Sequence, residues 1–306
     1  MTMQNRKQYQ QRFLRLIRKV QDTYREAVYE AIRAQINYFA NNYTGTETPI
    51  YLPTQKLRKA LRRIYETAGY NNGRYVRQSI KRDTVKADMT PGERLRWMIN
   101  EYYRQNLLDQ AVVPITNTTR KQIIQVLDQA NEEGWGVDKT VRMLKKTDIT
   151  RTRAELIVRT ETMRAANAGA MLGAADMGIA VNKEWISAQD SRTRYIPRNQ
   201  YDHLHMDGRQ AGYTEAFIIP STKSIDAMQY PGDPAGSAGN VCNCRCCVAF
   251  IPIRDQAGRP VSFERANPVG SLGNTFLRIA QQAAQLTITT SLIQQLIEEI
   301  EAADVE

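Results

Sequence analysis

The sequence has few cysteines and histidines and lacks any long uncharged apolar run. Its four cysteines all lie between residues 242 and 247, and the 306 residues include two histidines. Cysteines confined to neighbouring positions are a poor layout for a disulfide framework, so reduced thiols are expected. The lack of a run of about eighteen apolar residues excludes a transmembrane helix. Residues 1–18 also lack the apolar block of a signal peptide. We therefore expect a protein of the cell interior that makes no membrane contact.

The composition is otherwise that of a soluble globular protein with an excess of positive charge. Apolar residues make up 42% and charged residues 24%, which argues against general disorder and against a fibrous repeat. The formal charge is +10 and the pI about 9.5. An acidic partner is therefore favoured, either nucleic acid or an acidic protein surface.

Helical periodicity dominates the first half of the chain. Apolar residues recur at steps of three and four from Phe13 to Ile32, and a loop over 41–54 follows. A second helix begins near Leu57, and we expect Gly69 and Gly73 to punctuate it. Further helices are predicted over 90–108, with a start signal at Thr90-Pro91, and over 117–130, 138–146 and 152–178.

Basic residues are concentrated on the first two predicted helices. They are candidates for contact with nucleic acid or a partner, although the same pattern is typical of an amphipathic packing helix with a solvated basic face. We expect the first forty residues to be an arm whose deletion leaves a folded core. The candidate contact residues are Arg12, Arg15, Arg18, Lys19, Arg58, Lys59, Arg62 and Arg63.

The second half changes character, with short β-prone runs over 183–188, 216–219 and 248–253. The segment 220–240 is too long for a tight hairpin loop and is expected to be a surface excursion ordered only by partners or a metal. An apolar stripe over 292–300, with an acidic end, predicts a last helix. The predicted fold is α+β: a mostly helical N-terminal half, and a C-terminal module in which a long helix packs on a small, mainly antiparallel sheet. The predicted domains are 1–112, 113–253 and 254–306.

Three sequence pieces stand in a distinctive order. The first is Arg159-Thr160-Glu161-Thr162 with Asn167. The second runs from Trp185 through Asp190-Ser191-Arg192 to His203 and Asp207-Gly208. The third leads from Pro231-Gly232-Asp233 through Gly239-Asn240 to Cys242-Asn243-Cys244-Arg245-Cys246-Cys247.

Together these pieces resemble the head morphogenesis family of phage minor head proteins typified by the phage Mu F protein. The resemblance covers roughly residues 116–253. It implies a structural minor capsid protein that associates with the portal, enters the procapsid during assembly and lies inside the phage head, after synthesis in the host cytoplasm. It implies as partners the portal protein, a scaffold or major capsid protein and the packaged DNA, with several copies per virion. The motif residues expected to have structural roles are Arg159, Thr160, Glu161, Asn167, Trp185, Asp190, Arg192, Asp207, Gly208, Asn243 and Arg245.

This sequence departs from the commonest form of the family, in which a Cys-Pro-x-Cys pair and a histidine complete a zinc-like ligand set. Ser191, Arg192, Thr193 and Arg194 occupy the first of those regions here. A structural zinc ion remains a candidate cofactor, since imidazole, carboxylate and thiol donors are still present. On a strand, Cys242, Cys244 and Cys246 would share one face, which favours Cys244 and Cys246 acting together. Either these thiols bind metal or they pack as small apolar groups. The candidate metal ligands are His203, Asp190, Cys244 and Cys246, with His205 as the alternative histidine.

No catalytic constellation is expected. Arg159 and Glu161 lie roughly 200° apart around a helix, whereas Glu155 can pair with Arg159. Glu161 or Asn167 is expected to satisfy buried polar groups, and Arg192 and Arg194 are expected to form ion pairs that brace loops.

Two alternatives stay open: a plain DNA-binding protein, or a metal-dependent nuclease or other hydrolase. The hydrolase would use Asp190, His203, His205, Asp207 and the cysteines, although a thiol cluster suits structural zinc better.

Overall fold

The computed structural model describes residues 3–80, 91–146, 151–222 and 225–262, and these contain seven α-helices, one π-helical turn and five strands. The helices are α1 (Met3–Asn42), α2 (Gln55–Ser79), α3 (Pro91–Tyr102), the π-turn η1 (Tyr103–Leu107), α4 (Leu108–Glu132), α5 (Val137–Lys146), α6 (Arg151–Ala175) and α7 (Ala238–Val241). The strands are β1 (Val181–Ile186), β2 (Gln210–Gly212), β3 (Phe217–Ile219), β4 (Asp226–Met228) and β5 (Cys247–Pro252). The predicted α+β fold is confirmed.

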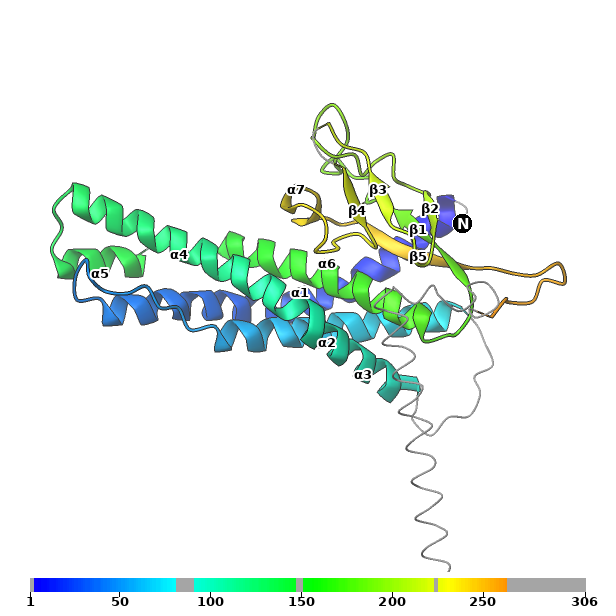
Figure 1. Cartoon of the computed structure of the whole chain (residues 1–306), viewed down its shortest axis with the longest axis horizontal. Helices are drawn as coiled ribbons and strands as arrows, with labels where there is room; N and C mark the ends of the chain where they lie inside the picture. The colour runs from blue at the N-terminus through cyan, green and yellow to red at the C-terminus, as the bar shows by residue number, and fades with distance from the viewer. Residues whose placement is uncertain (1–2, 81–90, 147–150, 223–224, 263–306) are drawn as a thin grey trace, which may run out of the picture.

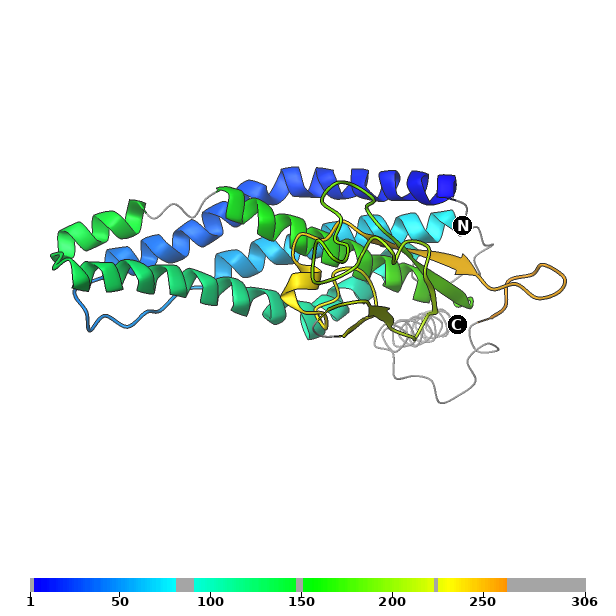
Figure 2. The same ribbon diagram turned by 90° about the horizontal axis from the view of Figure 1, so that it is seen from above.

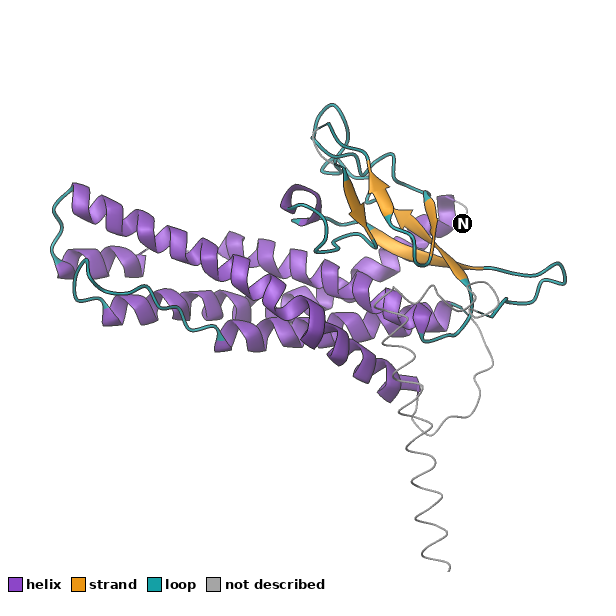
Figure 3. Cartoon of the chain, in the orientation of Figure 1, coloured by secondary structure: helices purple, strands orange, loops and turns teal. Residues whose placement is uncertain are grey.

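The long helices α1, α2, α4 and α6 run along the long axis of the molecule, and the strands gather near one end of this bundle (Figures 1 and 3). The predicted apolar face of α1 points into the core, where Phe13, Ile17 and Ile32 are buried. Each such side chain contributes about 1.5–3 kcal/mol when it is fully buried. None of the described helices is long and apolar enough to cross a membrane.

Glycines allow α2 and α6 to approach each other closely. A Cβ atom on Gly73 would lie 2.6 Å from the backbone oxygen of Gly169, and a Cβ on Gly169 or Gly173 would collide with the backbone of Gly69 or Gly73. The expectation that Gly69 and Gly73 interrupt the second helix is therefore wrong. Both glycines lie inside α2. Because they have no side chain, the backbone of α6 can come into contact with the backbone of α2 at these positions.

The helical segments from α3 to α4 follow one another without a loop. The π-turn η1 joins α3 directly to α4, and Pro114 lies inside α4. The sequence predicted a gap between helices at 108 and 117, but the helix continues through it. A proline removes one backbone hydrogen bond, and here that loss does not end the helix.

The sheet has three antiparallel strands in the order β2-β1-β5, and β3 and β4 form a separate antiparallel pair. The predicted strands at 183–188, 216–219 and 248–253 correspond to β1, β3 and β5. Strands β2 and β4, of three residues each, were not predicted. The sheet packs on α6 and on the start of α1 through β5.

The start of α1, the blue end of the first helix in Figures 1 and 2, is joined to the sheet by hydrogen bonds. The Tyr9 hydroxyl donates to the Val248 carbonyl at 3.0 Å, and the Gln10 amide donates to the Ser187 carbonyl at 2.9 Å. Helix α1 also packs along α2 and α6. This packing argues against a dispensable arm, since α1 supplies part of the core.

The segment 220–240 carries structure of its own in its described residues. It includes β4 and most of α7, and the Asp233 carboxylate accepts hydrogen bonds from the backbone N–H groups of Gln229 and Ala235. This corrects the expectation that only partners or a metal order the segment, because short aspartate-centred turns satisfy its backbone locally.

Some predictions fall elsewhere. Thr90, the stripe at 292–300 and most of the predicted domain 254–306 lie outside the described residues. The boundaries 1–112 and 113–253 stay predictions, and residue 112 lies within α4.

Candidate functional site

The cysteine cluster lies in a turn between α7 and β5. Asn243 has a φ of 60°, which turns the chain, and β5 begins only at Cys247. The expected strand alternation of Cys242, Cys244 and Cys246 is therefore wrong. Cys242 is exposed, whereas Cys244 and Cys246 are buried.

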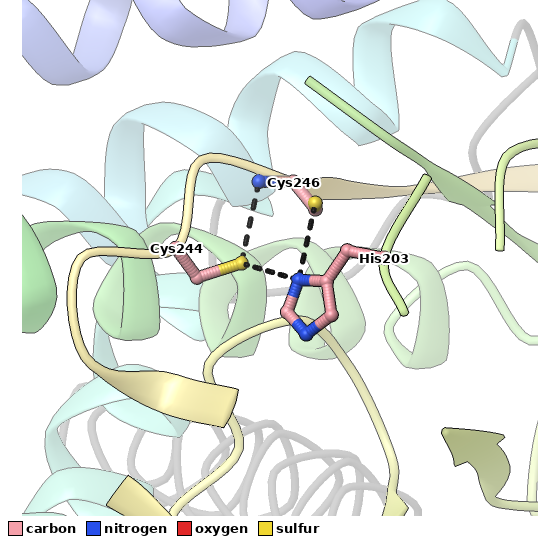
Figure 4. Close-up of side chains that lie close together, drawn as sticks. All are labelled: His203, Cys244 and Cys246. Atoms are coloured by element: carbon pink, nitrogen blue, oxygen red, sulfur yellow. Dashed lines mark hydrogen bonds between the residues drawn. The ribbon is translucent and has the colours of Figure 1, made fainter. Parts of the chain in front are cut away.

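His203 brings its imidazole against the two buried thiols (Figure 4). Its Nδ1 atom lies 3.6 Å from the Cys244 Sγ and 3.7 Å from the Cys246 Sγ. The backbone N–H of Cys246 also donates to the Cys244 Sγ at 3.4 Å. One donor atom from each of the three side chains lies within 4.8 Å of the others. We call His203, Cys244 and Cys246 the thiol–imidazole cluster.

The orientation of the imidazole is set from its far side. The His203 Nε2 lies 2.7 Å from the Asn240 Oδ1, and the Asn240 amide nitrogen donates to the Asp226 Oδ2 at 2.6 Å. Because the amide nitrogen faces a carboxylate, the amide oxygen faces the ring and accepts a hydrogen bond from the Nε2–H group. The Nδ1 lone pair is therefore directed at the thiols.

The two clustered thiols differ in acidity. Hydrogen bonding with the Cys246 thiol lowers the pKa of Cys244 well below its usual value, against the effect of burial. The same hydrogen bond and burial raise the pKa of Cys246. Burial also raises the pKa of Cys247, which is not part of the cluster. Cys244 is the more easily ionised of the pair.

The donor set fits a zinc ion. With Zn–N near 2.0–2.1 Å and Zn–S near 2.3 Å, a tetrahedral ion separates its nitrogen and sulfur ligands by roughly 3.6 Å. The two Nδ1–Sγ distances in the cluster, 3.6 and 3.7 Å, match that edge.

Two predicted metal ligands lie apart from this cluster. The Asp190 carboxylate accepts hydrogen bonds from the Arg245 guanidinium at 2.9 and 2.6 Å. Partial burial acts to raise the pKa of Asp190, but the hydrogen bonds and charge of Arg245 lower it overall. His205 is largely exposed, and its Nδ1 lies 2.7 Å from Asp202. These pairings correct the expectation that Asp190 or His205 joins the thiols.

The motif residues on α6 hold the cysteine turn in place. The Arg159 guanidinium donates to the Asn243 Oδ1 at 2.8 Å, and the Asn243 N–H donates to the Thr160 hydroxyl at 3.0 Å. Asn167 donates to the Cys246 carbonyl and accepts from the Val248 N–H. Arg159 thus contacts Asn243, whereas the sequence suggested Glu155.

Glu161 belongs to a buried polar group on the other side of α6. Its Oε2 accepts hydrogen bonds from the Tyr65 hydroxyl at 2.7 Å and from Arg164 at 2.8 Å. Arg164 also donates to the Gly232 carbonyl at 3.2 Å. This group joins α2, α6 and the loop at 229–233.

The loop after β1 is braced by partners that the sequence did not suggest. Arg6, at the start of α1, pairs with Asp207 at 3.3 Å, and Asp207 also accepts from the Ser187 N–H. Gly208 has a φ of 77° and lies beside the Arg6 guanidinium. The expected braces, Arg192 and Arg194, act otherwise: the Arg192 backbone N–H donates to Asp190, and the Arg194 side chain donates to the Cys242 carbonyl.

Trp185 is buried, as expected of a core residue, and its ring meets the His203 ring edge to face with centroids 5.4 Å apart. The indole therefore forms one wall of the thiol–imidazole cluster.

Comparison with known proteins identifies the region that carries these contacts. Residues 121–249 match the family described as Phage Mu protein F like protein. The chain contains a Phage Mu F-like domain. Neither the curated proteins nor the solved structures include a match. The domain supports a role in phage head morphogenesis, with the virion as its location and other phage head components as its partners.

The Mu F-like region includes α5, α6 and almost all of the small sheet, whereas α1, α2 and α3 precede it. The motif residues and the thiol–imidazole cluster all fall within the matched residues. The contacts of Arg6 and Tyr65 show that the preceding helices complete the same packed unit.

The candidate nucleic-acid residues lie outside the Mu F-like region, on α1 and α2, and the structure does not bring them to the cluster. Arg58 and Arg62 have acidic partners, Asp109 and Glu66. Arg58 is half-buried, and the other members of the set are exposed: Arg12, Arg15, Arg18, Lys19, Lys59, Arg62 and Arg63.

Sequence reasoning missed Arg6, Asp226 and Lys183. Arg6 meets Glu184 and Asp207 across most of the chain length, so no local pattern could reveal it. Asp226 has a weak sequence signal, because it lies in the polar segment 220–240 together with its partner Asn240, which is already among the ordered motif pieces.

Lys183 is a buried lysine on β1. Its Nζ donates to the Gln229 carbonyl and side-chain oxygen at 2.9 and 2.7 Å, and burial lowers its pKa to about 7. Between about pH 7 and the ordinary lysine value of 10.5 the unfolded chain binds more protons at this site, so this residue makes stability rise with pH.

Replacing Lys183 with Met is therefore expected to flatten the increase in the free energy of unfolding between pH 7 and 10. Urea unfolding at several pH values would measure it, with Lys19→Met as an exposed control. Equal slopes in the wild type and the Lys183→Met variant would contradict a depressed lysine pKa.

Proposed function

We propose that the protein is a structural minor component of a tailed-phage head that joins the portal during procapsid assembly and lies inside the head near the portal. Its partners would be the portal protein and a scaffold or major capsid protein, with several copies per virion. In this proposal it has no catalytic role.

The observation that supports a structural role is the way the motif side chains are used. Arg159, Thr160 and Asn167 hydrogen-bond to the cysteine turn, and Asp190 pairs with Arg245. These residues are engaged with one another across distant segments. The motif side chains thus join distant segments of one module, and this use favours a structural role over a catalytic one.

Co-expression with the portal protein of the same phage tests portal association. We expect the two proteins to elute together in size-exclusion chromatography at a fixed ratio. The major capsid protein, co-expressed in the same way, provides the comparison. Separate elution from the portal under conditions where both proteins are folded would contradict the proposal.

Contact with packaged DNA is a second proposal, and it is favoured by the exposed Arg15, Arg18 and Lys19 along α1. Reversing these three charges to Glu is expected to weaken DNA retention. If each contacts a phosphate, the slope of log affinity against log salt should fall by about 3. Filter binding over a series of salt concentrations would measure it.

A control for net charge reverses Lys139, Arg142 and Lys145, which are exposed on α5. An equal loss of DNA binding in both triple variants would contradict a DNA contact on α1, because it would reflect total charge alone.

The geometry gives the nuclease alternative less support. Asp190 pairs with Arg245 and Asp207 with Arg6, and neither carboxylate belongs to the thiol–imidazole cluster. Phosphodiester hydrolysis by magnesium calls for converging oxygen ligands. DNA cleavage by purified protein with magnesium, lost on Asp190→Asn, would restore that alternative.

A further inference from the structure

We propose that His203 Nδ1, Cys244 Sγ and Cys246 Sγ together bind one Zn²⁺ ion, and that Asn240 and Asp226 position the histidine for it. This site does not depend on portal association. Its role would be to hold the Mu F-like module together.

The three donors are buried and suited to one another. The relative exposure of each of the three residues is 1–2%, and the two Nδ1–Sγ distances match the nitrogen–sulfur edge of a zinc tetrahedron. Two thiolates and one neutral imidazole give a zinc complex with no net charge. Such a complex can be buried without a counter-ion, whereas an unpaired buried charge is costly. The three side chains supply three of the four positions of a zinc tetrahedron.

The hydrogen-bond chain behind His203 is the kind that orients a metal ligand. Ligating histidines usually donate their second N–H to an oxygen acceptor, which fixes the tautomer. Here that acceptor is the Asn240 Oδ1, and Asp226 in turn accepts from the Asn240 amide at 2.6 Å. Ser237 donates to the same Asp226 oxygen from its N–H and its hydroxyl, at 2.8 and 2.6 Å. Asp226 is thus held in place by two residues, Ser237 and Asn240.

An ion at this position would tie together segments that are far apart in the sequence. His203 comes from the loop between β1 and β2, and the two cysteines come from the turn before β5. The Cys246 carbonyl is already bonded to Asn167 of α6 at 3.2 Å. The ion would therefore fasten the long loop to the helix that supports the sheet.

Nearby residues of the same types provide matched controls. Cys242 is an exposed cysteine two positions from Cys244, and His205 is a largely exposed histidine two positions from His203. Neither belongs to the cluster. Variants at Cys242 and His205 therefore remove a thiol or an imidazole close to the cluster without removing one of its proposed ligands.

Metal content and cobalt spectra of the full-length protein test the proposal. Protein purified without chelator is expected to hold about one zinc ion per chain, as measured by inductively coupled plasma mass spectrometry. After chelation, added Co²⁺ should give thiolate-to-cobalt absorption and the intense visible bands of a tetrahedral ion. Cys244→Ser, Cys246→Ser and His203→Ala should each lose these signals, whereas Cys242→Ser and His205→Ala should keep them.

The Asn240→Ala variant tests whether Asn240 positions His203. The zinc affinity of this variant, measured by competition with a chromophoric chelator, should be about 10–100-fold lower than that of the wild type. Asp226→Asn should weaken binding in the same direction. Circular dichroism of each variant would separate loss of metal from loss of fold, and the cobalt titration of the wild type does not depend on any variant folding.

Several results would overturn the proposal. Wild-type protein that holds no zinc and gives no thiolate–cobalt absorption would do so, as would a Cys244–Cys246 disulfide found by counting thiols after denaturation. Equal loss of metal in the Cys242→Ser control would show that the metal is not bound by the thiol–imidazole cluster alone, as proposed. Because these measurements use the isolated chain, their failure would leave the portal proposal standing.

Discussion

Removal of residues 3–42, which form α1, is expected to leave the rest of the chain without a stable fold. The helix buries Phe13, Ile17, Ile32 and Ile36 against α2 and α6. Helix α1 also carries Arg6, whose guanidinium pairs with the buried Glu184 carboxylate. Removal of the helix would remove this ion pair. Far-UV circular dichroism and urea unfolding of the truncated chain would measure the loss.

A point variant tests the same conclusion without changing the chain length. Ile32→Ala is expected to lower the free energy of unfolding by about 2–5 kcal/mol, since it opens a cavity in the core. Arg15→Ala, on the exposed face of the same helix, should change it by less than about 0.5 kcal/mol. A truncated chain with a cooperative unfolding transition would show that α1 is an accessory arm after all.

Gly169→Ala is expected to have the second large effect. The added Cβ would meet the backbone oxygen, Cα and carbonyl carbon of Gly69, so α2 and α6 would have to move apart. Overpacking a core commonly costs about 1–3 kcal/mol, and here the obstacle is backbone, which cannot rotate away. Thermal and urea unfolding would measure the destabilisation.

The control for this variant is Gly136→Ala, where the added Cβ would meet nothing within 4 Å. Gly136 precedes α5, so a small effect through the helix start is expected, of a few tenths to about 1 kcal/mol. If Gly169→Ala were no more damaging than Gly136→Ala, the close helix contact would not hold in solution.

The elements that could be predicted are those whose signal lies in neighbouring residues. The spacing of Phe13, Ile17 and Val20 predicted α1 and its buried face, and β1, β3 and β5 followed from short β-prone runs. Strands β2 and β4 were missed because three residues are too few to show an alternation. Gly69 and Gly73 were misinterpreted because a glycine that ends a helix and a glycine that allows a second helix to come close look alike in the sequence. Only the position of α6 distinguishes the two cases.

The candidate site divides along the same line. Local composition and motif order pointed to His203, Cys244 and Cys246. However, Asp190, which stands in the same sequence piece as His203, could equally have been a ligand. Its carboxylate is instead paired with Arg245, 55 positions away, and local sequence does not show this contact.

The low cysteine and histidine content leaves few positions at which a thiol–imidazole site can form. The sequence by itself determined that four thiols in six positions form a local cluster, that the first half is helical, and that the motif order is that of a Mu F-like domain. The tertiary structure decided which thiols are buried, which histidine meets them, and that α1 belongs to the core. Periodicity and motif order are properties of adjacent residues. Burial and ligand geometry, in contrast, arise from contacts between residues such as Tyr9 and Val248, 239 positions apart, which local sequence does not encode.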